Sequence, residues 1–244
     1  MSVVYPTLYL SAMGVGLGGL VDRHVAAMAG GLSGAPGRSL LDGVPYLVFV
    51  APGLLAGSSM QIAVSESTWP VFGALRFDGA YPSMLASPLR VRDVLLGHLG
   101  FVAFRLGTTD AAFLAITAAF SALRSPQALL ALPAGVLTGF AFATWLFAFA
   151  IGRESERSFS TLQRMVVVPL FLFSGTFYPV HELPGWMQVL AEVTPLYHGV
   201  ALCRAATLGH LVTSAVLGHL AYLVLVAGTG LVAALIAFEG RLGR

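Results

Sequence analysis

Long apolar stretches separated by short polar ones dominate this chain. A helix needs about 20 mostly apolar residues to cross the roughly 30 Å hydrocarbon core of a bilayer. We predict transmembrane helices in six stretches: residues 3–21, 44–64, 94–120, 127–152, 166–178 and 211–238. The fifth is the shortest, because Pro169 and Pro179 bracket it and prolines interrupt the sequence that follows. The pattern predicts an all-α integral membrane protein with one domain, a bundle of six helices.

The composition supports a membrane protein and excludes other classes. Hydrophobic residues make up 57% of the chain and charged residues 10%, whereas soluble domains carry roughly 25% charged residues. The net charge is only +2 and the arginines are scattered, so we expect no nucleic-acid partner. Cys203 is the single cysteine of the sequence, and no Cys/His cluster has metal-site spacing. We therefore expect neither a disulfide nor a metal centre.

The polar segments orient the bundle. Six spans place both termini on one side of the membrane, where the loops hold eight arginines against four on the other side. Because arginine-rich loops stay in the cytoplasm, we expect cytoplasmic termini and a cytoplasmic segment 65–93 in a plasma membrane, most simply a bacterial one. Segments 22–43 and 179–210 are then external. The stretch 3–21 lacks a cationic leader and a cleavage site, so we expect it to be a retained helix.

Glycines recur at a spacing of four, which lets helix backbones approach closely. The pairs are Gly14/Gly18, Gly53/Gly57 and Gly135/Gly139. With 28 glycines in the chain, chance spacing is the alternative explanation. The glycines near residue 14 also resemble a dinucleotide loop, but no strand precedes them, so helix packing is the better interpretation. A phosphate-binding loop with its lysine is excluded, because the sequence contains no lysine.

Two charged residues lie inside the third span. Arg105 and Asp110 are five residues apart, which misses the three or four that would pair them on a helix. A charge at this depth is costly unless it pairs, snorkels or faces water. We treat them as a candidate intramembrane polar site, with Arg105 facing the bundle interior. The alternatives are that Arg105 snorkels to the interface or that the span has other limits.

Prolines and aromatic residues punctuate residues 171–209, an apolar half-span followed by short amphipathic segments. Backbone broken at membrane depth must be buried in protein or line a watery cavity. The segment therefore predicts a re-entrant helical hairpin that caps the external end of a pathway. A long external loop with two surface helices is the alternative. A dyad of Ser174 and His219, as in an intramembrane hydrolase, is a third hypothesis, although no G-x-S motif is present.

A family resemblance rests on this same segment. It carries Ser174-Gly175-x-Phe177-Tyr178-Pro179, then Leu183-Pro184-x-Trp186, then Pro195-Leu196 and Arg204. Three further stretches agree: Tyr9 to Gly18, Tyr46-x-x-Phe49-x-Ala51-Pro52-Gly53, and Tyr81-x-x-Met84 to Leu89. The sequence resembles the ABC-2 type transporter permeases over nearly its whole length. Within that family it is most similar to the nodulation lipo-oligosaccharide exporters and the daunorubicin/doxorubicin efflux permeases.

The resemblance implies a function and its partners. It implies a permease homodimer with two separate ATPase subunits, which bind ATP and Mg²⁺, and export of an amphipathic or lipid-linked molecule such as a drug, lipo-oligosaccharide or glycolipid. The chain itself would be no enzyme. A non-transporting membrane scaffold subunit is the alternative from another class.

The resemblance also implies roles for two groups of residues. The segment 65–93 would contain the coupling helix that contacts the ATPase. We expect ATPase coupling from Glu66, Arg76, Tyr81, Arg90 and Arg92. We expect an external cap from Ser174, Gly175, Phe177, Tyr178, Pro179, Leu183, Pro184, Trp186, Pro195 and Arg204.

Overall fold

The computed structural model describes residues 45–119, 126–209 and 212–242, and in these ranges the chain forms helices and connecting turns without strands. The first predicted span, 3–21, and the pair Gly14/Gly18 lie outside the described residues. The long helices are α3 (Tyr46–Ser67), α6 (Val91–Ala119), α7 (Ala131–Ile151) and α12 (Thr213–Leu242). The shorter elements are α4 (Trp69–Arg76), α5 (Ala80–Leu85), η2 (Pro126–Leu130), α8 (Arg157–Leu162), η3 (Gln163–Val167), α9 (Val168–Phe173), η4 (Val180–Glu182), α10 (Gly185–Glu192) and α11 (Pro195–Leu208).

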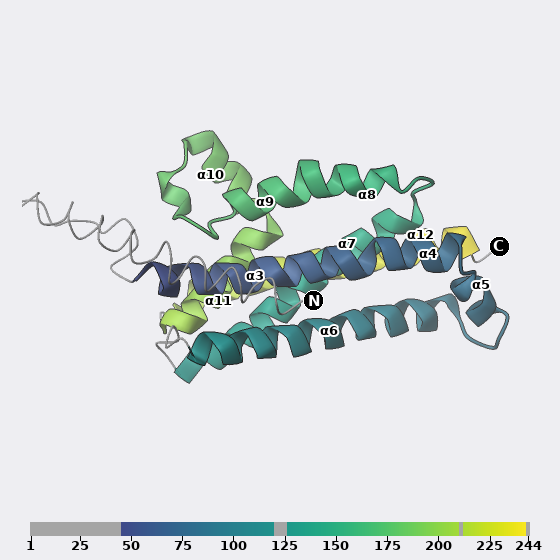
Figure 1. Cartoon of the computed structure of the whole chain (residues 1–244), viewed down its shortest axis with the longest axis horizontal. Coiled ribbons are helices and arrows are strands. Elements are labelled where there is room, and N and C mark those ends of the chain that lie inside the picture. The colour runs from purple at the N-terminus through teal and green to yellow at the C-terminus, as the bar shows by residue number, and fades with distance from the viewer. Residues whose placement is uncertain (1–44, 120–125, 210–211, 243–244) are drawn as a thin grey trace, which may run out of the picture.

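Four of the helical segments are long and apolar enough to span a membrane: Tyr46–Arg76, Val91–Ala119, Gln127–Ile151 and Thr213–Leu242. They overlap the second, third, fourth and sixth predicted spans. They lie lengthwise in one bundle, with α4 and α5 at one end and α10 and α11 toward the other (Figure 1). We call these the α5 end and the α10 end.

The fifth predicted span differs from the expectation of 166–178. α8, η3 and α9 follow one another without a break from Arg157 to Phe173, and residues 174–178 are bends rather than helix. The helix begins earlier because Arg157 and Arg164, expected in a loop, lie on its exposed side, where a long side chain can reach polar surroundings. η3 is a π-helical turn inside this rod.

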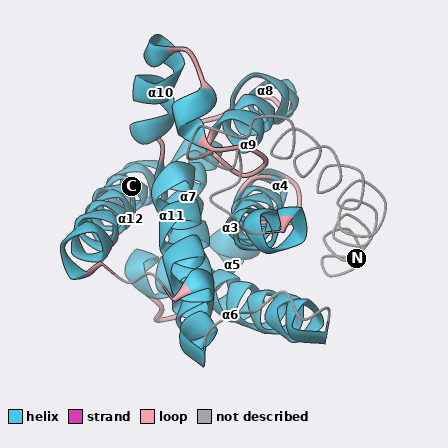
Figure 2. Ribbon diagram, turned by 90° about the vertical axis from the view of Figure 1, so that its left-hand side faces the viewer, coloured by secondary structure: helices cyan, strands magenta, loops and turns pink. Residues whose placement is uncertain are grey.

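Helix α7 is the centre of the bundle and packs against α3, α6, α11 and α12 (Figure 2). The segment 65–93, expected to be a polar segment that contains a coupling helix, is largely helical, because α3 continues to Ser67 and α4 and α5 follow it. Thr68 separates α3 from α4, and its hydroxyl donates to the Val64 carbonyl at 2.6 Å. The α5 end is therefore a folded unit attached to the bundle.

Two of the glycine pairs lie at close helix contacts, which confirms their packing role. A Cβ at Gly53 would lie 2.8 Å from the Thr176 backbone, and one at Gly57 would overlap the Phe171 ring. On α7, a Cβ at Gly135 would lie 2.7 Å from the Asp110 carboxylate. Any larger residue at these positions would push α3 away from the 171–176 segment or α7 away from α6.

Candidate functional site

A polar cluster joins three helices at the α5 end. The Arg105 guanidinium on α6 pairs with the Glu66 carboxylate on α3 at 3.1 Å. His98 Nε2 lies 3.1 Å from the Glu66 carbonyl, and His98 Nδ1 lies 3.0 Å from the Tyr81 hydroxyl on α5. Since a carbonyl only accepts, Nε2 carries the proton and Nδ1 accepts from Tyr81. His98 thus connects α5 to both α3 and α6.

Tyr81 also anchors α5 through its ring. The ring is buried and lies 5.3 Å from the Phe238 ring and 6.4 Å from the Phe147 ring. Burial raises the pKa of the Tyr81 phenol, so the phenol keeps its proton and remains a donor to His98. The short helix α5 is therefore held in place by both the hydroxyl and the ring of Tyr81.

The predicted coupling residues fall into two groups. Glu66 and Tyr81 belong to the polar cluster. Arg76, Arg90 and Arg92 are exposed and lie outside it. Arg76 donates to the Arg153 carbonyl at 3.3 Å, and Arg92 pairs with Glu239 of α12 at 3.3 Å with both side chains largely exposed. The structure therefore brings together two of the five residues and leaves three arginines on the surface of that end.

Arg105 and Asp110 form no pair with each other, as their spacing predicted. Each instead finds a partner on α3: Arg105 contacts Glu66, and both Asp110 carboxylate oxygens lie within 3.0 Å of the Ser59 hydroxyl. Asp110 is fully buried, whereas the Arg105 side chain is 38% exposed. Two polar contacts therefore join α3 to α6 at different depths in the bundle.

At the α10 end, the chain turns sharply after α9. Gly175 has φ +81, a conformation that favours glycine, and a Cβ there would lie 2.8 Å from the Val180 side chain. The neighbouring Ser174 hydroxyl lies 3.1 Å from the Thr194 hydroxyl. Thr194 also caps α11 by accepting from the Tyr197 amide at 3.4 Å. The Gly175 conformation and the bond between Ser174 and Thr194 thus fix where the bent segment meets α11.

Arg204 ties this turn to the bundle. Its Nη2 donates to the Gly175 carbonyl at 2.8 Å and to the Phe49 carbonyl of α3 at 3.4 Å. The guanidinium also lies over the Phe49 ring, 3.9 Å from its centroid. Arginine suits this position because its planar fork can bond and stack at once. One side chain of α11 thereby holds both the 175 turn and the start of α3.

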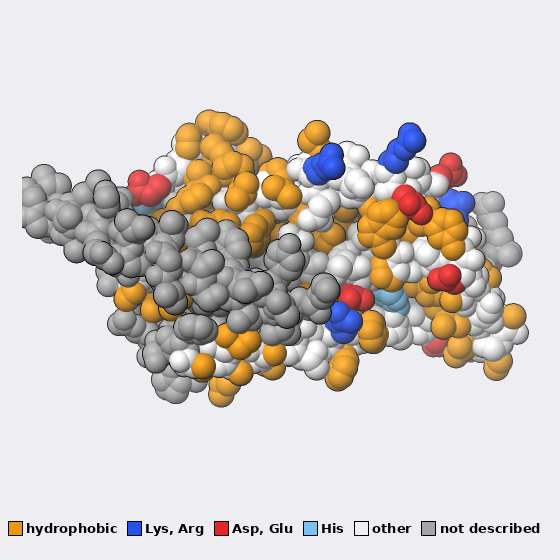
Figure 3. Space-filling model, viewed as in Figure 1, with side chains coloured by type: hydrophobic (Ala, Val, Ile, Leu, Met, Phe, Trp, Pro, Cys, Tyr) orange, Lys and Arg blue, Asp and Glu red, His pale blue; other side chains and the backbone are white. Residues whose placement is uncertain are grey.

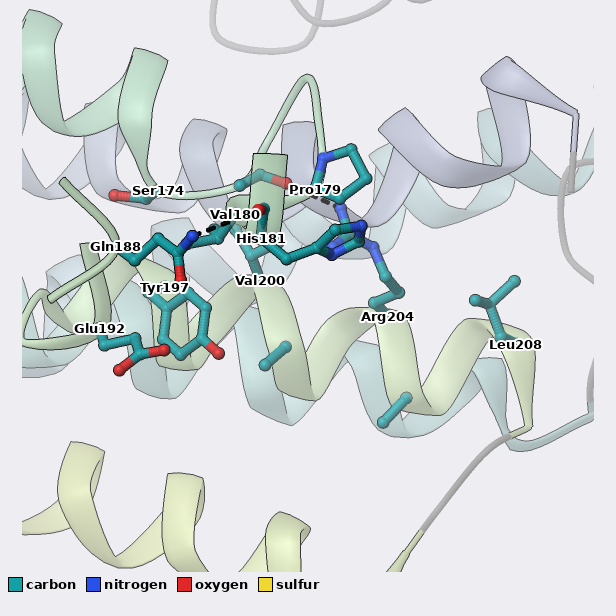
Figure 4. Close-up of a pocket in the computed structure, with 13 residues that line it drawn as sticks. Ser174, Pro179, Val180, His181, Gln188, Glu192, Tyr197, Val200, Arg204 and Leu208 are labelled. Atoms are coloured by element: carbon teal, nitrogen blue, oxygen red, sulfur yellow. Dashed lines mark hydrogen bonds between the residues drawn. The ribbon is translucent and has the colours of Figure 1, made fainter. Parts of the chain in front are cut away.

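A cavity of about 550 Å³ lies between the bent segment, α10 and α11. Its polar lining includes Ser174, His181, Gln188, Glu192, Tyr197 and Arg204 (Figure 4). The amide of Gln188 donates to the Leu183 carbonyl at 2.8 Å and to the His181 carbonyl at 3.2 Å, which shapes one wall. The volume falls within the roughly 300–1,000 Å³ typical of small-molecule sites.

The remaining predicted cap residues lie around this cavity in different roles. Pro179 lines it, Leu183 offers its carbonyl to Gln188, and Pro195 opens α11. Phe177 packs edge-on against Phe171 at 5.2 Å, and Tyr178 is half-buried. Pro184 and Trp186 are exposed at the start of α10. Only part of the motif therefore faces the cavity, and the role of these residues as an external cap stays a prediction.

A histidine pair beside the cavity was missed by sequence reasoning. His198 Nδ1 on α11 lies 2.7 Å from His219 Nδ1 on α12, and His198 Nε2 lies 2.9 Å from the Glu192 carbonyl. The Tyr222 ring stacks on His198 at 3.8 Å, and its hydroxyl donates to the Val193 carbonyl. The only sequence signal was the presence of His219. Burial, followed by the nearby His219, lowers the pKa of His198.

These contacts do not form the hydrolase dyad considered above. The Ser174 hydroxyl is bonded to Thr194, and His219 is bonded to His198. Within the described ranges 45–119, 126–209 and 212–242, no group of three or more His, Cys, Asp or Glu side chains could hold a metal ion. The geometry supports a binding cavity rather than a nucleophile with its base.

Known proteins resemble this chain over most of its length. It is 31% identical over 205 residues to Nodulation protein J of Rhizobium leguminosarum bv. trifolii, covering 84% of this chain and 72% of that protein. It is 30% identical over 203 residues to Nodulation protein J of Sinorhizobium fredii, covering 83% and 71%. It is 28% identical over 172 residues to the daunorubicin resistance ABC transporter permease protein DrrB1 of Streptomyces coeruleorubidus, covering 67% and 55%.

No solved structure matches the chain. The sequence profile described as ABC-2 type transporter matches residues 1–208, which include the α5 end, the Gly175 turn and Arg204. This match confirms the resemblance expected from the motifs. Four apolar helices of spanning length among the described residues agree with a membrane protein. The chain therefore belongs to the ABC-2 type transporter family, as a membrane permease of an ABC exporter.

Proposed function

We propose that this chain is one half of a permease homodimer that exports an amphipathic or lipid-linked molecule, using ATP hydrolysed by two copies of a separate subunit. ATP and Mg²⁺ would bind to that partner. The observation that carries the proposal is the profile match over residues 1–208, together with two ends of different chemistry. The α5 end offers exposed arginines, and the α10 end holds an open cavity lined by both polar and apolar side chains.

Six spans per subunit are part of the proposal. Residues 157–173 form a rod about 25 Å long at 1.5 Å per residue, close to the hydrocarbon thickness. Together with the four longer helices and the apolar stretch 3–21, this rod supports a count of six. An even count keeps both termini on the cytoplasmic side of the plasma membrane, in agreement with the arginine distribution.

The α5 end is the proposed contact with the ATPase. Its surface carries Arg76, Arg90 and Arg92, which can pair with carboxylates of a partner. Behind this surface, Tyr81 and Glu66 connect α5 to α3 and α6 through His98. A displacement of α5 by the ATPase would therefore act on α3 and α6 together. The segment 65–93 would then make different contacts with the ATPase in the two conformations of the permease, as any ATP-driven conformational change requires.

The α10 end is the proposed external cap, with residues 179–210 forming a re-entrant hairpin. α10 exposes Trp186, Val189 and Leu190, which are apolar, and directs Gln188 and Glu192 toward the cavity. A helix on a water-exposed loop would show the opposite arrangement. The apolar exterior favours a hairpin in contact with lipid over a loop in water.

Reconstitution with the partner ATPase tests this function. The chain would be co-expressed with an ABC ATPase encoded beside it, purified as a complex, and placed in lipid nanodiscs. We expect ATP hydrolysis that rises severalfold with the transported amphipath, tested among glycolipids, lipo-oligosaccharides and anthracyclines. An ATPase variant without its Walker lysine is the control. A complex whose hydrolysis ignores every such compound would instead support a scaffold subunit.

A further inference from the structure

The Asp110 carboxyl group on α6 is buried in the interior of the bundle. Neither Asp110 nor its hydrogen-bond partner on α3, Ser59, has any exposed surface. On another side, the α7 backbone closes over the pair at Gly135, where an added Cβ would lie 2.7 Å from Asp110 Oδ2 and 3.2 Å from Ser59 Oγ. Three helices therefore enclose this carboxyl group, and none of the contacts described for the two ends of the bundle uses it.

No cation balances a negative charge at this position. Among the residues that the structure describes, no arginine or histidine lies within ion-pair distance of Asp110. Arg105, on the same helix, pairs with Glu66 instead. α7 has no titratable side chain from Ala131 to Ile151, and α11 brings the uncharged Cys203 thiol within electrostatic reach of Asp110. A buried carboxylate without a counter-charge is far more costly than a neutral carboxylic acid.

The other helices packed against α6 carry their titratable groups toward the ends of the bundle. α5 places Tyr81 against His98 of α6. On α12 these groups are His219 and Tyr222 toward the α10 end and Glu239 and Arg241 toward the α5 end. On the face shown in Figure 3, charged side chains likewise gather toward the α5 end, and hydrophobic ones cover α9 and α10. None of the groups named here contacts Asp110.

The hydrogen bonds around Ser59 indicate where the proton lies. Ser59 Oγ is 2.9 Å from the Leu55 carbonyl oxygen, and 2.9 and 3.0 Å from the two Asp110 carboxyl oxygens. A serine has one hydroxyl hydrogen, and carbonyl and carboxylate oxygens only accept. If Asp110 were ionised, three acceptor oxygens would share that one hydrogen. A protonated Asp110 can donate to Ser59 Oγ, which leaves the Ser59 hydrogen for Leu55.

From this geometry we propose that Asp110 is a proton-binding site in the membrane interior, occupied while α3, α6 and α7 are packed together. Separation of α3 from α6 would admit water, in which an aspartic acid is ionised at neutral pH because its ordinary pKa is about 3.9. Such an opening would release one proton. A higher pH would therefore favour the open arrangement, and a lower pH would favour the packed one.

Infrared spectroscopy detects a protonated carboxyl group directly, through its C=O stretching band. The full chain would be measured in nanodiscs of ether-linked lipid, which has no ester carbonyl, at about pH 6, where carboxyl groups in water are ionised. We expect this band in the native chain and its loss in Asp110→Asn. Asp78→Asn, the same change at an exposed position, should retain the band. If Asp110→Asn fails to fold, carbon-13 in the aspartate carboxyl groups of the native chain identifies the band by its isotope shift.

The thermal midpoint of Asp110→Asn relative to the native chain tests proton release. Subtracting the two midpoints at each pH cancels the titration of His198 and of other groups that both chains share. A proton that the folded chain holds and the unfolded chain releases makes the native chain lose stability, relative to the variant, as the pH rises above about 4. We expect a shift of a few degrees in favour of Asp110→Asn between about pH 4.5 and 6.5. Asp78→Asn should show no such shift.

Two results would overturn the proposal: a native chain without a protonated-carboxyl band that depends on Asp110, or a midpoint difference that stays constant over this pH range. Both measurements use the chain without ATP or a partner, so either result leaves the export function standing. Conversely, a complex whose ATP hydrolysis ignores every amphipath would leave the infrared band of Asp110 unchanged. The two proposals therefore fail separately.

Discussion

The two ends of the bundle hold their helices together by different means. At the α5 end, three of the contacts join side chain to side chain: Arg105 to Glu66, Tyr81 to His98, and Arg92 to Glu239. Two others, from His98 and Arg76, reach backbone carbonyls. At the α10 end, side chains mainly bond to backbone carbonyls, as Arg204 does with Gly175 and Phe49. The side chains of such pairs can instead form pairs with side chains of a partner protein. Bonds to the backbone hold the path of the chain itself.

This difference suggests separate tasks. A surface that docks a protein needs charges that can change partners, and the exposed arginines of the α5 end provide them. A cap beside a cavity needs a fixed backbone, and the Gly175 turn is held by the Arg204 guanidinium and by the bond between Ser174 and Thr194. We therefore expect mutations at the α10 end to unfold the cap, and mutations at the α5 end to alter coupling more than folding.

Arg204→Ala should have the largest effect. It removes the cation over Phe49 and the donor to two carbonyls, of which the Gly175 carbonyl lies in a bend outside any helix, and a buried acceptor left unpaired costs about 1–3 kcal/mol. We expect a loss of about 2–4 kcal/mol, measured as a lower thermal midpoint by fluorescence-detected size exclusion. Arg204→Lys should recover only part of it, because an ammonium cannot bond and stack as the guanidinium does. A variant as stable as the native chain would contradict the anchoring role.

Arg105→Ala should destabilise less. Glu66 would lose its partner 3.1 Å away, but the Arg105 side chain is 38% exposed, so water replaces part of the interaction. We expect about 1 kcal/mol, with a larger fall in cargo-stimulated ATP hydrolysis. The single variants Glu66→Gln and Arg105→Gln, measured with their double variant, give the coupling energy in a mutant cycle. Additive single effects would show that this pair does not join α3 to α6.

Acid should weaken the α10 end. The N–H···N bond between His198 and His219 needs one unprotonated nitrogen, so it cannot survive when both rings are charged. Burial lowers the pKa of His198 in the folded chain below its ordinary value near 6.5. The contribution of the neutral His198 ring to folding stability is therefore complete above about pH 6.5 and is lost as the pH falls below that value. We expect the thermal midpoint to fall by a few degrees between about pH 7.5 and 5.5.

The groups facing this pair are Glu192 of α10, Tyr197 of α11 and Tyr222 of α12. His198→Phe keeps a ring against Tyr222 and removes the titrating group, so its thermal midpoint should depend less on pH. An identical pH dependence in this variant would assign the acid effect to another group.

Arg92→Ala should have the smallest effect on stability. Its pair with Glu239 is exposed on both sides, and such pairs contribute about 0–1 kcal/mol. We expect an unchanged thermal midpoint but weaker binding of the ATPase, measured by co-purification at increasing salt. Arg164→Ala, on the exposed side of the rod at residues 157–173 and outside the segment 65–93, is a matched surface control. Unchanged binding in Arg92→Ala alone would remove this residue from the proposed interface.

Hydropathy predicted the long spans well, because length and apolar content alone decide whether a helix can cross a bilayer. It placed the start of the fifth span at residue 166 rather than 157, since an average over neighbouring residues does not show that Arg157 and Arg164 lie on the exposed side of the helix. Likewise, it could not predict that α4 and α5 fold within the segment 65–93.

The site was predictable where a motif carried it and hidden where it depended on distant pairs. Arg204 and Gly175 were named from the motif, although nothing in the sequence indicated that they touch. His98 lies 17 residues from Tyr81 and 32 from Glu66, and His198 lies 21 residues from His219. Such pairs become visible only when the helices are packed.

The π-helical turn η3 has a consequence for the cap. A π turn holds one residue more than an α turn, so the rod at residues 157–173 carries a surplus residue in the middle of its length. If the surplus shifts along the rod, the residues it passes rotate by about 100°, one step of a 3.6-residue turn. Phe171, whose ring now fills the space beside Gly57 of α3, would then turn away from that helix.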